Sequence, residues 1–316
     1  MQKAKFKTWF CKGRNCAESS SNTAYFNLKK IRSLVGIKNP GLIPKTAAWF
    51  KESMLTELEK LRNVTRKNLA TSLVSYLRLT APKSAKTEKA SQAMLRYAAK
   101  QDLFYKSQEK TERQKKNWIT FDELKQFYKE KQQEVKLKKI YKKAKWLPKD
   151  RKLAQEELML ALSGVKQPPV RLEMSSLTYV TTEPTSDFPK GNYLFQKRNQ
   201  WVALVQQSKI SSKKGDQRFT FEPSLARILN KLKRYLKNGD PVFQGKGNRM
   251  MSRNSFGKRL QGLFLERFGK RVGSQLLRAI YLSHKYKNMP SIEDMEKTSQ
   301  QMLHTTKTAL GKYVKR

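Results

Sequence analysis

Apolar side chains recur at every third or fourth position along much of this chain, which is the spacing of an amphipathic helix. After Pro44 the pattern runs through Trp49, Phe50, Met54, Leu55, Leu58 and Leu61, and a second run follows in Leu69, Leu73, Tyr76 and Leu77. Ala81-Pro82-Lys83-Ser84 ends that run because proline cannot continue a helix, and the pattern resumes from Ala93 to Tyr105. We therefore expect a small helical domain over residues 45–112.

Residues 1–44 lack this regularity. The polar run Glu18-Ser19-Ser20-Ser21-Asn22 indicates a loop or part of a mobile basic arm. A disordered terminus and an arm that contacts a partner are equal alternatives at this point, so residues 1–44 are assigned only as a basic N-terminal arm.

A helix start is well marked at residue 120. Thr120-Phe121-Asp122-Glu123 has the form of a capping box, and Ile119 and Leu124 are placed to form the flanking hydrophobic staple. This helix is expected to run through a lysine-dense stretch to Lys145 and to stop before Pro148. Residues 113–149 then form a linker and connecting helix, and a further helix from Leu153 to about Leu162 opens a second domain, residues 150–316.

Short runs rich in β-branched and aromatic residues predict three strands, at residues 177–182, 201–205 and 218–221. Turn signals at residues 187–191 and 213–216 separate them, which favours an antiparallel sheet. Helical spacing returns from Leu225 to Leu236 and from Phe256 to Phe268. The expected fold class is mainly α with a small antiparallel β-sheet, an α+β fold.

The charge balance points to a polyanionic partner. The chain has 68 Lys and Arg residues against 25 Asp and Glu, a formal net charge of +43, while 38% hydrophobic content is enough for packed cores. No stretch approaches the roughly 20 apolar residues of a membrane-spanning helix. Residues 1–6 lack the apolar segment of a secretory signal, so an intracellular location is expected.

The sequence offers little to bind a metal. Cys11 and Cys16 are its only cysteines and have no histidine nearby, and His284 and His304 are its only histidines. A zinc site takes about four such ligands, so these residues are expected to be ordinary side chains. No nucleotide-binding motif is present either, and we expect no cofactor.

The candidate catalytic residues lie in the last forty or so positions of the sequence. Arg278 is followed 26 positions later by His304 and nine positions after that by Tyr313. An arginine can grip a phosphate with its planar fork of donors, a histidine can donate a proton, and a tyrosine hydroxyl can attack phosphorus. These residue types suffice to cut a DNA strand without a metal. Arg278 could instead form a structural ion pair, and most of the 12 tyrosines are expected only to pack.

This order of features resembles the tyrosine recombinase (phage integrase) family. The family's second arginine box reads approximately His-x-x-Arg and is followed by Gly-His-x8-Tyr. Gln275-Leu-Leu-Arg278 and Leu303-His304-x8-Tyr313 stand in those places. The resemblance covers residues 150–316 in detail and residues 45–112 only as the family's helical core-binding domain, which binds DNA.

Two further catalytic residues follow from the resemblance. The family's first arginine precedes the sheet, where Pro168-Pro169-Val170-Arg171 is similar to the version in recombinases of eukaryotic viruses and mobile elements. The catalytic lysine lies on a hairpin, here residues 208–215, and Lys209 is preferred over Lys213 and Lys214 because it ends the strand.

The sequence departs from the family pattern at two positions. Gln275 replaces a histidine or lysine, and glutamine cannot carry a proton. Met174 stands where the family commonly has an acid, with Glu173 offset by one residue. Both departures leave open a weakly active or inactive relative.

The resemblance implies a site-specific DNA recombinase or integrase that cleaves and rejoins DNA through a 3′-phosphotyrosine intermediate. Its partners would be double-stranded DNA and three further copies in a homotetramer, with no membrane and no cofactor. A type IB topoisomerase and a non-catalytic basic nucleic-acid-binding protein are the alternatives. Nucleus, viral factory and bacterial cytoplasm are not distinguished.

Overall fold

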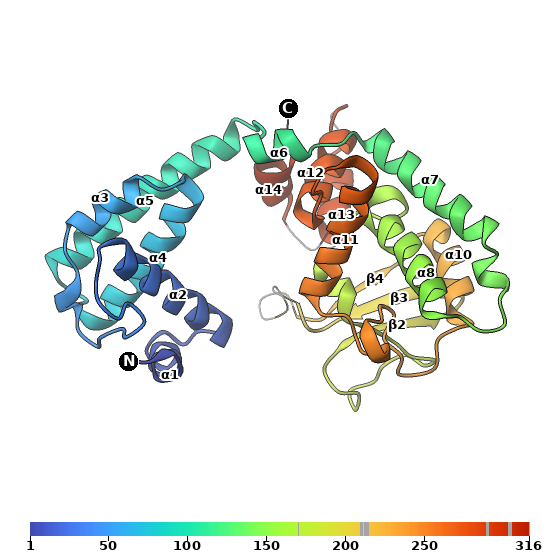
Figure 1. Ribbon diagram of the computed structural model, residues 1–316, viewed down its shortest axis with the longest axis horizontal. Coiled ribbons are helices and arrows are strands. Elements are labelled where there is room, and N and C mark those ends of the chain that lie inside the picture. The colour runs from blue at the N-terminus through green and yellow to red at the C-terminus, as the bar shows by residue number, and fades with distance from the viewer. Residues whose placement is uncertain (170, 209–210, 212–214, 289–290, 303–304, 316) are drawn as a thin grey trace. The chain divides into compact units, whose positions relative to one another are not determined.

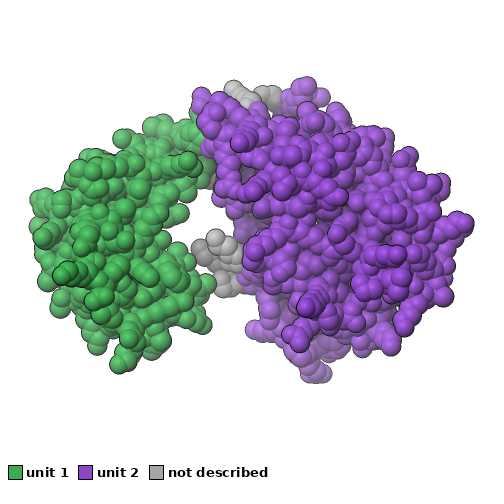
Figure 2. All heavy atoms as spheres, in the orientation of Figure 1, with its two compact units in different colours: residues 1–107 green, residues 108–316 purple. Residues whose placement is uncertain are grey.

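The computed structural model describes residues 1–316 except 170, 209–210, 212–214, 289–290, 303–304 and 316. The chain divides into two compact units, residues 1–107 and residues 108–316, which are coloured separately in Figure 2. Each unit has its own buried apolar core.

Unit 1 is helical. Its helices are α1 (Lys3–Arg14), α2 (Glu18–Leu34), α3 (Ser53–Glu59), α4 (Asn63–Thr80) and α5 (Ala85–Lys106), with a 3₁₀ turn at Ala47–Trp49. The expected helices after Pro44 are confirmed, although the first is broken into the 3₁₀ turn and α3. Ser84 caps α5 by accepting a hydrogen bond from the backbone of Thr87.

The loop expected at residues 18–22 is wrong, because these residues form the first turns of α2. Residues 1–44 also pack into unit 1 rather than forming a free arm: Phe6 and Leu28 are fully buried and Ile31 nearly so. Helices α1 and α2 each bury only a few apolar residues among many polar ones, chiefly lysines and serines. The apolar residues therefore do not form a clear helical pattern in the sequence.

Unit 2 combines helices with one sheet. Its longer helices are α7 (Phe121–Leu137), α8 (Pro148–Leu160), α10 (Pro223–Lys233), α11 (Arg253–Phe268), α12 (Ser274–Lys285) and α13 (Ile292–Gln301), and its short ones are α6 (Glu112–Asn117) and α14 (Thr306–Thr308). The capping box at Thr120 is confirmed, since both of its hydrogen bonds are present. The helix that begins there, α7, ends at Leu137 and not at Lys145. Pro148, which was expected to follow the end of a helix, is instead the first residue of α8, where its missing N–H removes no helical hydrogen bond.

The sheet has four strands rather than the expected three, in the order β1-β2-β3-β4: β1 (Leu177–Tyr179), β2 (Asn192–Lys197), β3 (Gln200–Val205) and β4 (Gln217–Thr220). It is mixed, because β1 runs parallel to β2 while the other neighbours are antiparallel. Strand β2 escaped prediction because its first four residues are all buried, so they do not alternate in polarity.

Helices cover one face of this sheet, where α10 packs on β3 (Figure 1) and Trp201 is buried with its indole N–H donated to Asn230. The other face buries a smaller cluster that includes Phe195 and Val202. The fold class is thus confirmed as mainly helical α+β. Across the described parts of the chain, every helix is too short or too polar to cross a membrane.

Candidate active site

Arg278 lies at the centre of the candidate site. It occupies the second turn of α12, flanked by the buried residues Leu277 and Ile280, and only 2% of its surface is exposed. Burial lowers the pKa of its guanidinium, and the neighbouring Tyr313 counteracts this. A buried cation is costly unless its donors are satisfied, so the partners of Arg278 define the site.

The guanidinium joins three distant segments of unit 2. Its Nη1 donates to the Tyr313 hydroxyl at 3.1 Å, and its Nε donates to the Pro169 carbonyl at 3.3 Å. Its Nη2 donates to the carbonyl of Met302. The sequence placed Arg278 and Tyr313 in one site, and the structure brings them into direct contact.

Tyr313 ends a π-helical turn, Ala309–Tyr313, of the kind that often marks functional sites. Its ring packs in a small apolar cluster with Leu282 and Met302, and the Arg278 guanidinium lies 5.1 Å from the ring centroid. The chain after it is fixed to α12, because the backbone N–H of Lys315 donates to Ser283 at 2.7 Å. The hydroxyl is therefore held beside a cation.

Arg171 lies close to this pair. It immediately precedes the 3₁₀ helix η4 (Leu172–Ser176), and its positive charge lowers the pKa of Arg278 further. The Nε of Arg171 is buried and has no hydrogen-bond partner among the described residues. An unsatisfied buried donor next to a second guanidinium favours an anion as the missing partner.

The carboxylate of Glu173 acts on Arg278, because its charge raises the pKa of the guanidinium. It is 4% exposed, and its Oε2 has no hydrogen-bond partner in the described part of the chain. Met174, at the position of the family's usual acid, is buried in the apolar core instead. The acid near Arg278 is therefore Glu173, one residue before the position where the family commonly has it.

The remaining predicted residues are not brought to this centre by the described structure. Gln275 lies on the first turn of α12 and is exposed. Lys209, Lys213, Lys214 and His304 lie outside the described residues. His284 is exposed and stacks on Phe121 with ring centroids 4.4 Å apart, as expected for a residue on the outer face of a helix.

Sequence reasoning missed the carbonyl groups of Pro169 and Met302, because backbone acceptors carry no residue signature. Cys11 and Cys16 are free cysteines, as the sequence predicted. The Cys11 and Cys16 sulfur atoms are 3.6 Å apart in unit 1, and burial raises the pKa of the Cys16 thiol. Within the described ranges, no three His, Cys, Asp or Glu side chains are grouped so that they could hold a metal ion.

No protein-family model matches this sequence, and no curated protein does. Among solved structures the chain is similar to "Crystal structure of XerA recombinase", at 12% identity, with 97% of this chain and 91% of that chain covered and a TM-score of 0.39. That likeness is distant.

Proposed function

We propose that this chain is a tyrosine recombinase that cleaves and rejoins DNA through a covalent 3′-phosphotyrosine bond. The observation that carries the proposal is the hydrogen bond from the buried Arg278 to the Tyr313 hydroxyl, with Arg171 close by. A nucleophile and two phosphate-binding cations are then present in one place.

In the proposed reaction the Tyr313 hydroxyl gives up its proton to solvent as its oxygen attacks the scissile phosphorus, and the bond from phosphorus to the 5′ oxygen breaks. The phosphate stays on Tyr313, and the departing 5′ oxygen takes up a proton. Arg171 and Arg278 stabilise the negative charge on the non-bridging oxygens as it develops. Rejoining is the reverse step with a second 5′-hydroxyl, so the reaction consumes no ATP.

The resting contacts of Arg278 still leave donors for a phosphate. The guanidinium has five N–H groups, and it gives one each to Tyr313, Pro169 and Met302. A second N–H on Nη1 and on Nη2 can therefore donate to a non-bridging phosphate oxygen, which would lie beside the Tyr313 hydroxyl.

Proton transfer is assigned by resemblance alone. Lys209 would protonate the leaving oxygen and His304 would stabilise the pentacoordinate phosphorus. Gln275 could donate a hydrogen bond to a phosphate oxygen but could not transfer a proton. The net charge of +43 supports duplex DNA as the substrate, and the family pattern supports a homotetramer on two duplexes.

The test uses nicked suicide duplexes tiled from the DNA that flanks the gene, incubated with the protein in EDTA. A covalent adduct should survive SDS, retain a label on the 5′ side of the break and leave a free 5′-hydroxyl. Tyr313→Phe should abolish it. Tyr281→Phe is the matched control, because Tyr281 is a half-buried tyrosine on α12 with no hydrogen bond to Arg278 among those described.

Arg278→Lys separates chemistry from binding. Lysine keeps the charge but lacks the planar fork that spans three acceptors. Loss of one such electrostatic group typically costs about 10²–10³-fold in rate, and we expect an adduct rate reduced at least that much with duplex affinity retained. Tight DNA binding with no adduct on any tile would instead support the non-catalytic alternative, and relaxation of supercoils without strand exchange would support a topoisomerase.

A further inference from the structure

Strand β4 forms one edge of the sheet in unit 2. It pairs with β3 on one side, and among the described residues no strand pairs with its other side. An edge strand presents a row of backbone N–H and C=O groups that another extended chain can bind.

The direction of those groups follows from the strand register. The N–H of Phe221 donates to the Trp201 carbonyl, so Phe221 and Trp201 form a hydrogen-bonded pair. Hydrogen-bonded and non-hydrogen-bonded pairs then alternate from there along the antiparallel strands β3 and β4. Phe219 bonds to β3, while Arg218 and Thr220 direct their backbone N–H and C=O groups away from it. An incoming strand would find these groups at the regular spacing that it requires.

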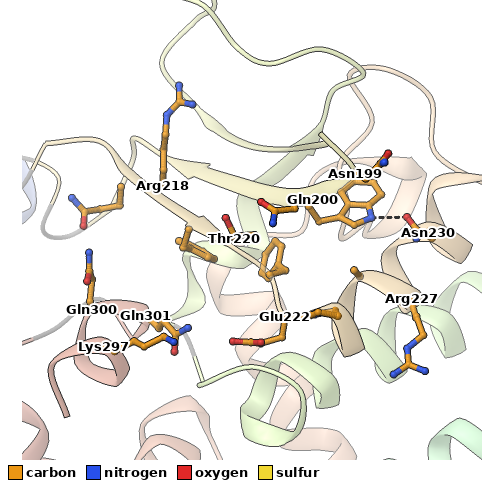
Figure 3. A pocket seen from close by; sticks show the side chains of 16 residues that line it. Asn199, Gln200, Arg218, Thr220, Glu222, Arg227, Asn230, Lys297, Gln300 and Gln301 are labelled. Carbon is orange, nitrogen blue, oxygen red and sulfur yellow. Dashed lines mark hydrogen bonds between the residues drawn. The ribbon is translucent and has the colours of Figure 1, made fainter. Parts of the chain in front are cut away.

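Hollows flank β4 on both faces of the sheet. A cavity of about 560 Å³ lies on the face that carries Trp201 and Phe221, and α13 supplies Lys297, Gln300 and Gln301 to its wall (Figure 3). A second hollow of about 390 Å³ lies over Val202 and Thr220. Successive side chains of a strand point to opposite faces, so two hollows on opposite faces suit a strand added at this edge.

The charges around both hollows are mostly positive. Arg227 and Lys297 line the larger one, and Arg198 lines the smaller; none of the three is in an ion pair among the described residues. Lys197 and Arg218 share Glu183 as their partner. Glu222 is the acidic residue in these linings. The edge therefore attracts an anionic ligand.

We propose that β4 is a docking site for an extended acidic peptide segment of a partner protein, which adds as a fifth strand beside Arg218 and Thr220. A peptide uses both features of the edge: its backbone pairs with the outward N–H and C=O groups, and its carboxylates meet Arg227, Lys297 and Arg198. A DNA phosphate would use the cations but would leave the strand's outward groups without matched partners.

The test measures binding of a fluorescent, end-blocked peptide of alternating Glu and Val to the full chain. Thr220→Pro deletes one outward N–H without removing a bond to β3, a substitution that edge strands tolerate. A lost hydrogen bond is worth about 0.5–1.5 kcal/mol, so we expect up to about tenfold weaker binding. Thr220→Val keeps the N–H and should bind like the original chain.

Two further arms keep the test decisive if Thr220→Pro unfolds the sheet. Two versions of this peptide are N-methylated, one at the odd residues and one at the even residues. Alternate N–H groups of an extended strand lie on opposite edges, and only one edge would pair with β4, so only one of the two versions should lose affinity. Arg227→Glu with Lys297→Glu should weaken the acidic peptide, whereas Lys149→Glu on the exposed start of α8 should not. Absence of binding, or binding that ignores both N-methylation and Thr220→Pro, would overturn the proposal. If duplex DNA displaces the peptide, and neither N-methylation nor Thr220→Pro changes peptide affinity, the edge would be assigned to DNA instead.

Discussion

Gly164 lies where α8 passes through a π-helical turn into the segment that carries Arg171. Its φ of +120° is a conformation that residues with a Cβ rarely adopt. A Cβ here would also lie 3.2 Å from the Tyr281 ring. Gly164→Ala should lower the free energy of unfolding by more than about 1 kcal/mol, as measured by urea denaturation, because strain and crowding add.

Gly262 provides the matched substitution. It lies inside α11, and a Cβ there would meet no atom within 4 Å. Alanine is favoured over glycine in a helix interior by about 0.5–1 kcal/mol, so Gly262→Ala should stabilise the protein by that amount. Equal changes in unfolding free energy for Gly164→Ala and Gly262→Ala would contradict the positive φ at Gly164.

Glu157 is a buried carboxyl in unit 2 whose pKa is raised by desolvation. It accepts a hydrogen bond from the Tyr141 hydroxyl at 2.9 Å, and this bond, followed by Lys231 and Gln132, partly opposes the rise in its pKa. The same carboxylate, together with burial, raises the pKa of Tyr128 to about 12. The neutral acid is therefore the better fit to this pocket.

Because the folded protein holds the Glu157 proton more tightly than the unfolded chain does, its contribution to stability is complete below the ordinary pKa of 4.5 and falls as the pH rises through the raised value. Glu157→Gln keeps an acceptor for Tyr141 but does not ionise. Its unfolding free energy relative to the original chain should increase from pH 4 to pH 8. A difference that is constant with pH would rule out a raised pKa.

At the scale of elements, two capping boxes allow a direct comparison. Thr120 caps α7, which buries Leu124 and Phe127, whereas Thr111 caps α6, which buries none of its residues. Loss of a cap costs about 0.5–2 kcal/mol when the helix contributes to the core. Thr120→Ala should therefore lower the thermal midpoint of unit 2 clearly, and Thr111→Ala should leave it almost unchanged.

The elements that the sequence identified are those with a strong local signal. The Thr120 box marks the start of α7 within a single turn, and α4 repeats leucine at helical intervals. Strand β2 gave no such signal because burial on both faces removes the alternation of polar and apolar residues. Its pairing with β1 depends on a connection through residues 180–191, which local patterns do not describe.

The candidate site shows the same division. Spacing and resemblance predict that Arg278 and Tyr313 share a site, and the two side chains are hydrogen-bonded at 3.1 Å. The carbonyls of Pro169 and Met302 complete the environment of Arg278, yet any residue type supplies a carbonyl. Only the folded chain reveals which backbone groups meet a side chain, so such partners cannot be found from the sequence.

For the whole molecule, the excess of positive charge is a cost unless a polyanion offsets it. A net charge of +43 on 316 residues repels itself in the compact state. Each of the two units is compact on its own, and lysines and arginines occur in both. Duplex DNA, the proposed substrate, would neutralise many of these charges and release the counterions that its phosphates had condensed.

This release makes the affinity for DNA depend steeply on salt. A protein that neutralises about six phosphates should give a slope of about −5 in a plot of log Kobs against log salt concentration, and more contacts give a steeper slope. We expect a slope of about −5 or steeper for a duplex without a cleavage site, measured by fluorescence anisotropy. Tyr313→Phe is the matched control, since it removes covalent attachment without changing the charge, and it should give the same slope. A slope shallower than about −2 would mean that few of the basic residues contact DNA, and the charge would then need another polyanion to account for it.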